Sequence, residues 1–127
     1  MTINNPEKFC SGLWDWGILN GCFGATRIKP TDIDGFVERN GKFLILEAKS
    51  PGAEIPTGQM ITFKRLIDTG YFTVIIVWGN TNNPERLTVM TSRTTREIDQ
   101  ADLERLRSIV SNWFEFANST PVFSFSE

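Results

Sequence analysis

Four charged side chains, those of Asp32, Asp34, Glu47 and Lys49, are predicted to share one face of a β-hairpin. In the expected register Asp34 lies opposite Glu47 and Asp32 lies opposite Lys49. The Cβ atoms of such opposite residues are about 4.5–5.5 Å apart. Two carboxylates this close repel each other unless a cation lies between them or one is protonated. The pattern therefore predicts a site for Mg²⁺, which binds carboxylate oxygens and keeps several waters, with Asp34 and Glu47 as its main ligands.

The same residues have the chemistry needed for phosphodiester hydrolysis. The backbone carbonyl of Ala48, between Glu47 and Lys49, could add a metal ligand, and Mn²⁺ could substitute for Mg²⁺. A bound metal ion of this kind polarises a phosphoryl oxygen and activates a water, while Lys49 would stabilise the developing negative charge. Two other interpretations stay open: a solvated charged face, and a structural network of ion pairs.

The dipeptide Asn40-Gly41 sets this register, because it separates two strand-like runs, residues 32–39 and 42–49. Asn-Gly between such runs is the strongest short-range signal of a two-residue hairpin, since both turn positions need a positive φ. Side chains alternate between the two faces of a strand, which places the four charges together. Apolar residues occupy both faces, so we expect the hairpin to be covered on both sides.

The segment Pro30-Thr31-Asp32-Ile33-Asp34-Gly35, followed by Glu47-Ala48-Lys49, resembles the bipartite signature of the PD-(D/E)xK nuclease superfamily. Restriction endonucleases, Holliday-junction resolvases and phage or repair nucleases belong to this superfamily. The resemblance covers residues 5–78. It implies an α/β fold with a restriction-endonuclease-like αβββαβ core, in which helices flank a central mixed sheet, and the last strand and helix are an addition to that core.

The resemblance also implies roles for residues outside the triplet. Gln59 resembles a glutamine that positions the lysine, water or DNA in several branches of the superfamily. Many members have an acidic residue on the first helix, for which Glu7 and Asp15 are the candidates, and we favour Asp15 because it lies in an apolar setting. Counting from the proline of the motif favours Asp32 as metal ligand, whereas the register favours Asp34. We expect Asp34 to bind the metal and Asp32 to assist or replace it.

The remaining elements follow from apolar periodicity, capping residues and turn signals. The sequence predicts a helix from Asn5 to about Asn20, a short strand at 23–29, a helix from Thr57 to Gly70, strands at 72–78 and 86–90, and a final helix that begins at Asp99 or Asp102.

The chain has 127 residues and no histidine. This length predicts a single domain spanning residues 1–127. The lack of histidine excludes Ser–His–Asp and Cys–His nucleophiles, a histidine general base and histidine-bound zinc, but it leaves hydrolysis by carboxylates, metal and lysine open. The two cysteines, Cys10 and Cys22, suit neither a zinc site nor a disulfide scaffold. We expect them to be small core residues in a reducing cytoplasm.

Together these features predict a Mg²⁺-dependent nuclease that hydrolyses DNA and is directed to a DNA structure or to DNA ends. The rival interpretation is a catalytically inactive nuclease-fold module that binds DNA or protein. Small compact members of the superfamily are common in phages, which implies the cytoplasm of a bacterial or phage-infected cell.

The net charge of −2 opposes tight binding to free DNA. This charge favours a homodimer or an enzyme assisted by a partner protein. The sequence shows no secretory signal and no apolar run long enough to cross a membrane, so we expect no membrane association.

Overall fold

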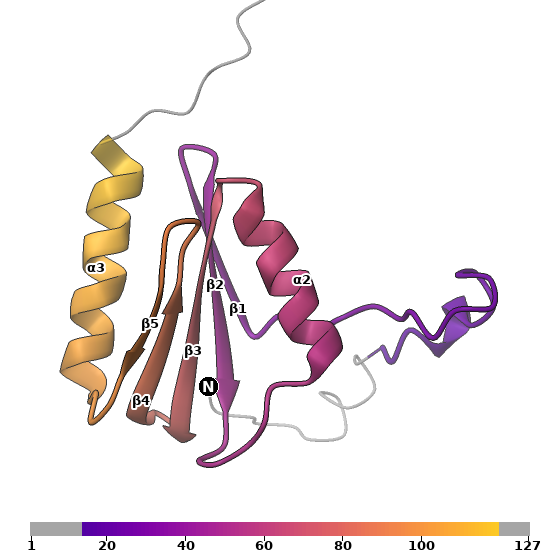
Figure 1. The fold of residues 1–127 in the computed structure, drawn as a ribbon, viewed down its shortest axis with the longest axis horizontal. Helices are drawn as coiled ribbons and strands as arrows, with labels where there is room; N and C mark the ends of the chain where they lie inside the picture. The colour runs from indigo at the N-terminus through magenta and orange to yellow at the C-terminus, as the bar shows by residue number, and fades with distance from the viewer. Residues whose placement is uncertain (1–13, 120–127) are drawn as a thin grey trace, which may run out of the picture. The chain divides into compact units, whose positions relative to one another are not determined.

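The computed structural model of the chain describes residues 14–119. They belong to two units, Met1–Asp32 and Ile33–Glu127, each described by itself. The second unit is α/β with a mixed sheet, as the sequence predicts; the sheet has five strands and is accompanied by two α-helices. Its elements, drawn in Figure 1, are β1 (Gly35–Arg39), β2 (Lys42–Lys49), α2 (Thr57–Asp68), β3 (Phe72–Asn80), β4 (Asn83–Met90), β5 (Thr95–Ile98) and α3 (Leu103–Ser119).

The strands lie in the order β1-β2-β3-β4-β5, so every strand pairs with its neighbours in the chain. Strands β2 and β3 are parallel, and the other three pairs are antiparallel. A parallel pair needs a crossover connection, which α2 provides.

The β1–β2 hairpin has the predicted register. Asn40 and Gly41 have φ values of 52° and 74°, which suits a two-residue turn with two positive φ angles. Arg39 pairs with Lys42, and Gly35 pairs with Leu46. The expectation of cover on both faces is correct for β2 but wrong for β1, which forms an edge of the sheet and has mostly exposed residues.

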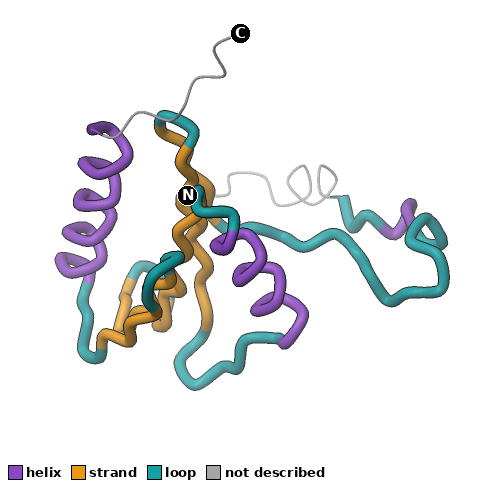
Figure 2. Tube along the Cα trace, turned by 45° about the horizontal axis from the view of Figure 1, so that its top comes forward, coloured by secondary structure: helices purple, strands orange, loops and turns teal. Residues whose placement is uncertain are grey.

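The two helices cover opposite faces of the sheet, and each packs over its own apolar core. The core under α2 contains Ile45, Phe63, Ile67, Val74, Ile76, Trp78 and Met90. The core under α3 contains Leu44, Ile75, Leu87, Val89, Ala101, Trp113 and Ala117. Neighbours such as Leu44 and Ile45 contribute to different cores, because side chains alternate along a strand. Figures 1 and 2 show the strands between the two helices.

Helix α3 begins where one of the two predicted caps places it. The Asp102 carboxylate accepts a hydrogen bond from the backbone N–H of Arg105 at 2.9 Å, the usual arrangement at a helix N-terminus. Helix α2 begins at Thr57 as the first helical residue, with Pro56 before it and no side-chain cap. None of the helices in the described part of the chain is long and apolar enough to cross a membrane.

Several predictions for the N-terminal region are wrong. Within 14–20, where a helix was expected, the structure has one short 3₁₀ turn, η1 (Gly17–Leu19); residues 1–13, including Cys10, lie outside the described part. The strand expected at 23–29 is absent from this stretch, which forms turn and coil. Gly24 has a φ of 67°, and Thr26 bonds through its hydroxyl to the Phe23 carbonyl at 2.7 Å. Such local bonds compete with a sheet ladder. Cys22 is exposed, contrary to its expected core role.

At the other end of the chain, the structure adds what the sequence did not predict. Strand β5 pairs with β4, although its exposed, polar stretch gives little apolar alternation. Strand β4 begins at Asn83, three residues earlier than expected.

Replacement of Phe63 by alanine is expected to lower the free energy of unfolding by about 3–5 kcal/mol, because this side chain is 1% exposed between α2 and the sheet. Ile61 on the same helix is 44% exposed, so Ile61→Ala should change it by about 0.5 kcal/mol or less. Urea denaturation of both variants measures the difference. Equal losses would contradict the orientation of α2.

Candidate active site

The predicted site residues lie where the parallel strands β2 and β3 end. Glu47 pairs with Ile76 and Lys49 pairs with Trp78. The carboxyl ends of parallel strands form one edge of a sheet, which is a common place for ligands. Glu47 and Lys49 therefore extend from the carboxyl end of an internal strand, where this strand leaves the sheet.

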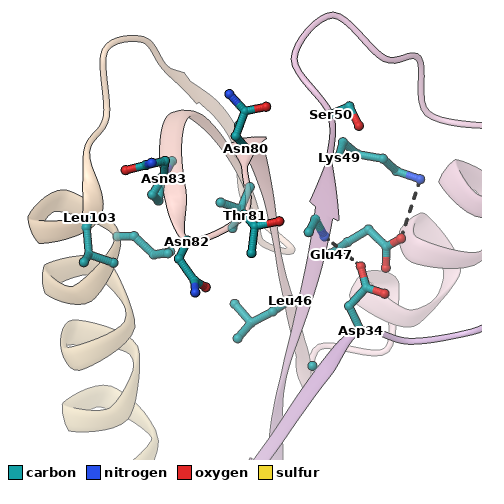
Figure 3. Close-up of a pocket in the computed structure, with 16 residues that line it drawn as sticks. Asp34, Leu46, Glu47, Lys49, Ser50, Asn80, Thr81, Asn82, Asn83 and Leu103 are labelled. Carbon is teal, nitrogen blue, oxygen red and sulfur yellow. Dashed lines mark hydrogen bonds and ion pairs between the residues drawn. The ribbon is translucent and has the colours of Figure 1, made fainter. Parts of the chain in front are cut away.

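Asp34 reaches this edge through a side-chain bond. The β1–β2 ladder ends at the pair Gly35–Leu46, so it stops one residue short of Asp34, which precedes Gly35 in the chain. The Asp34 Oδ2 atom then accepts a hydrogen bond from the backbone N–H of Ala48 at 2.9 Å. Figure 3 shows the carboxylates of Asp34 and Glu47 on the same side of β2. Asp34 does not form the predicted ladder pair with Glu47, because it lies beyond the end of β1.

Glu47 is the buried acid of the site, with only 6% of its surface exposed. Its Oε1 atom accepts a hydrogen bond from Gln59 Nε2 at 2.9 Å and lies 3.5 Å from Lys49 Nζ. Its Oε2 atom is buried and has no hydrogen-bond partner among the described residues. A buried carboxylate oxygen without a donor or a cation destabilises the folded state. A cation next to Oε2 would remove this cost.

Gln59 lies in the first turn of α2, the helix that follows the loop after β2. Its amide nitrogen bonds to Glu47, while its Oε1 atom is buried and also lacks a partner among the described residues. The side chain of Lys49 is 16% exposed, so its ammonium can reach a ligand at the edge. The structure therefore brings Glu47, Lys49 and Gln59 together.

Three oxygen-bearing groups at this end of β2 could hold a hard cation. Glu47 offers its free Oε2, Asp34 offers Oδ1, and Ala48 offers a backbone carbonyl. Within residues 14–119 no group of three or more His, Cys, Asp or Glu side chains could hold a metal ion. Mg²⁺ tolerates such a small set because it is usually bound through one or two carboxylates and keeps several waters.

The remaining predicted acids lie in the other unit or outside the described residues. Asp15 accepts a hydrogen bond from the N–H of Gly17 at 2.8 Å, at the start of η1. Asp32 is the last residue of that unit, and Glu7 precedes the described residues. The roles suggested for Asp15, Glu7 and Asp32 stay predictions.

A polar network that the sequence did not predict continues the site across the sheet. Trp78 pairs with Lys49 on one side and with Arg86 on the other. The Arg86 guanidinium lies 4.2 Å from the centre of the Trp78 ring and 3.3 Å from a carboxylate oxygen of Glu97. Thr88 links the indole N–H of Trp78 to the same Glu97 oxygen. Arg86 is thus held on the face that bears Lys49, where a second cation could meet a phosphate.

A cavity of about 520 Å³ adjoins the site and is called the end cavity below. It is bordered by the last residues of β2, the β3–β4 turn and the start of α3. Its lining includes the site residues and also Leu46, Ser50, Val77, Asn80, Thr81, Asn82, Asn83, Leu103 and Leu106. The run Asn80-Thr81-Asn82-Asn83 is predicted from the sequence only as a turn, so its place in the lining of the end cavity could not be foreseen.

No protein-family model, curated protein or solved structure matches this chain. The resemblance to the PD-(D/E)xK nucleases therefore stays a prediction based on the residues themselves.

Replacement of Gln59 by leucine is expected to lower the free energy of unfolding by about 1–3 kcal/mol, because it removes a donor from a buried carboxylate. The loss should be smaller in a Glu47→Gln background, where no charge is left buried. A double-mutant cycle measured by urea denaturation gives the coupling. Equal losses in both backgrounds would show that Gln59 does not support the charge of Glu47.

Proposed function

We propose that this protein is a Mg²⁺-dependent nuclease of the PD-(D/E)xK kind that hydrolyses phosphodiester bonds in DNA. The observation that supports this most is the buried carboxylate of Glu47, which has one oxygen without a partner among the described residues and lies between Asp34 and Lys49. A buried polar atom without a partner is destabilising and uncommon in native proteins, so this oxygen favours a site for a cation over an ion pair kept only for stability.

In this proposal each residue has a distinct task. Asp34 and Glu47 hold the metal ion, with the Ala48 carbonyl as a further ligand. When bound, Mg²⁺ supplies Lewis-acid activation of a phosphoryl oxygen and of a water. Lys49 stabilises the negative charge that grows on the phosphoryl oxygens, and Gln59 keeps the Glu47 carboxylate in place. A water oxygen bonds to phosphorus and loses a proton to solvent, the bond to the leaving sugar oxygen breaks, and that oxygen takes up a proton from solvent.

The proposed setting follows from the charge of the chain. A net charge of −2 weakens the attraction of the whole molecule to DNA, and salt weakens it further. We therefore propose action on DNA ends or structures, as a homodimer or with a partner protein, in the cytoplasm of a bacterial or phage-infected cell. Bound metal would offset part of the acidic charge at the site itself.

Purified protein is expected to cut DNA only when Mg²⁺ or Mn²⁺ is present. Asp34→Asn, Glu47→Gln and Lys49→Met should each lower the rate by about 10²-fold or more, the scale on which loss of charge stabilisation acts. Linear, circular, single-stranded and branched DNA, resolved on gels, give the measurement. Glu54→Gln is the control, because Glu54 is an exposed acid in the loop after β2 and should keep full activity.

Retention of cleavage in all three site variants would refute the assignment of the site. DNA that shifts on a native gel without metal and is never cut would favour the binding module instead.

Mg²⁺ is also expected to raise the melting temperature of the wild-type protein, because a ligand that binds only the folded state stabilises it. The gain is about 2.7 kcal/mol at a concentration of 100 Kd. The Glu47→Gln variant should lose most of this rise, whereas Glu54→Gln should keep it. Differential scanning calorimetry over a range of Mg²⁺ concentrations tests this without any substrate, and an equal rise in all three proteins would exclude Glu47 as a ligand.

A further inference from the structure

The end cavity has two chemically different walls. Leu46, Val77 and Leu106 give it an apolar side, and the β3–β4 turn gives it three amide side chains, those of Asn80, Asn82 and Asn83. These amides are exposed, and Figure 3 draws no hydrogen bond to them from the residues that line the cavity. Donors and acceptors are therefore available beside an apolar surface.

The turn that carries the amides is held by its backbone. The β3–β4 ladder shifts register between Trp78 and Gly79, and such irregularities often redirect side chains next to active sites. Gly79 has a φ of 157°, and a Cβ atom there would collide with the carbonyl oxygen of Asn83. Asn82 has a φ of 60°, a conformation that asparagine tolerates. These features of the backbone define the conformation of the turn that carries the amides.

The chemistry of the cavity suits a flat, neutral ring with a polar edge. Figure 3 shows Lys49 on one side of β2 and Leu46, Thr81 and Asn82 on the other. The Lys49 ammonium is thus directed away from the amides, although Lys49, Glu47 and Asp34 also line the cavity (Figure 3). An asparagine amide presents one acceptor and two donors, the groups with which side chains read the edges of bases.

We propose that the end cavity binds an unpaired nucleobase of the DNA strand whose phosphodiester is held at Asp34, Glu47 and Lys49. This inference rests on the proposed nuclease function and names the substrate of that site. The Lys49 ammonium and the amides lie on opposite sides of β2 (Figure 3), so a sugar–phosphate chain that passes the end of this strand could place its phosphate on one side and its base on the other. A base stacked and paired in a duplex cannot enter a cavity. The enzyme is therefore selective for single strands, frayed ends or unpaired bases at junctions.

The test compares a single-stranded oligonucleotide with copies that carry one abasic nucleotide at successive positions. The wild-type protein should cut slowly when the missing base is next to the scissile phosphate and at the full rate when it is elsewhere.

Asn82→Gly keeps the backbone conformation, since glycine adopts a positive φ readily. It should raise KM by about threefold to tenfold, the value of one hydrogen bond, without lowering kcat. On the abasic strand that the wild-type protein cuts slowly, Asn82→Gly should have the same KM and kcat as the wild-type protein.

A second variant keeps the test independent of the amide. Leu106→Trp fills the cavity and should remove the preference for the intact strand. The control is Asn112→Ala, an exposed amide on α3 that does not line the end cavity and should behave as wild type. Equal rates on intact and abasic strands, or additive effects of Asn82→Gly and base removal, would overturn the base site while leaving the nuclease proposal standing. A wild-type protein that cuts no DNA in Mn²⁺ would overturn both.

Discussion

The half-satisfied carboxylate of Glu47 is the interaction on which the site depends. One oxygen has an amide and an ammonium beside it, and the other has no partner among the described residues. Burial makes this arrangement expensive, since a charge in a low-dielectric interior needs paired partners. The two apolar cores of the sheet must supply the stability that offsets it. A strained polar position within a well-packed scaffold is typical of a functional site.

The parallel pairing of β2 and β3 explains how the partners of this carboxylate assemble. The crossover between these strands places α2 over the face to which Glu47 points, and the first turn of that helix brings Gln59 within reach. Asp34 directly precedes β1. The antiparallel hairpin brings the start of β1 beside the end of β2, so Asp34 lies near the end of β2. Residues distant in sequence therefore meet at the end of one internal strand, β2. Apolar packing on both faces of the sheet holds the backbone of this strand.

Local signals sufficed for the parts of the fold that local chemistry determines. Asn40-Gly41 gave the hairpin and its register, and alternation gave the two faces of β2. Apolar spacing gave both helices of the sheet unit. The strand expected at 23–29 failed because a left-handed glycine and a threonine hydroxyl form turns there. Strand β5 was missed because its order comes from pairing with β4, which no local pattern reveals. The place of the β3–β4 turn in the lining of the end cavity could not be predicted, because only the tertiary fold brings it near the end of β2.

The two-residue turn at Asn40-Gly41 has a consequence for how such a protein can change during evolution. One residue added there would shift β1 by one position against β2 and turn each of its side chains to the other face. Asp34 would then leave the side of the sheet that bears Glu47, although every residue of the site would still be present in the sequence. The site is thus encoded in the spacing of the chain as much as in its residue types. Substitutions in the turn are more readily tolerated than insertions or deletions.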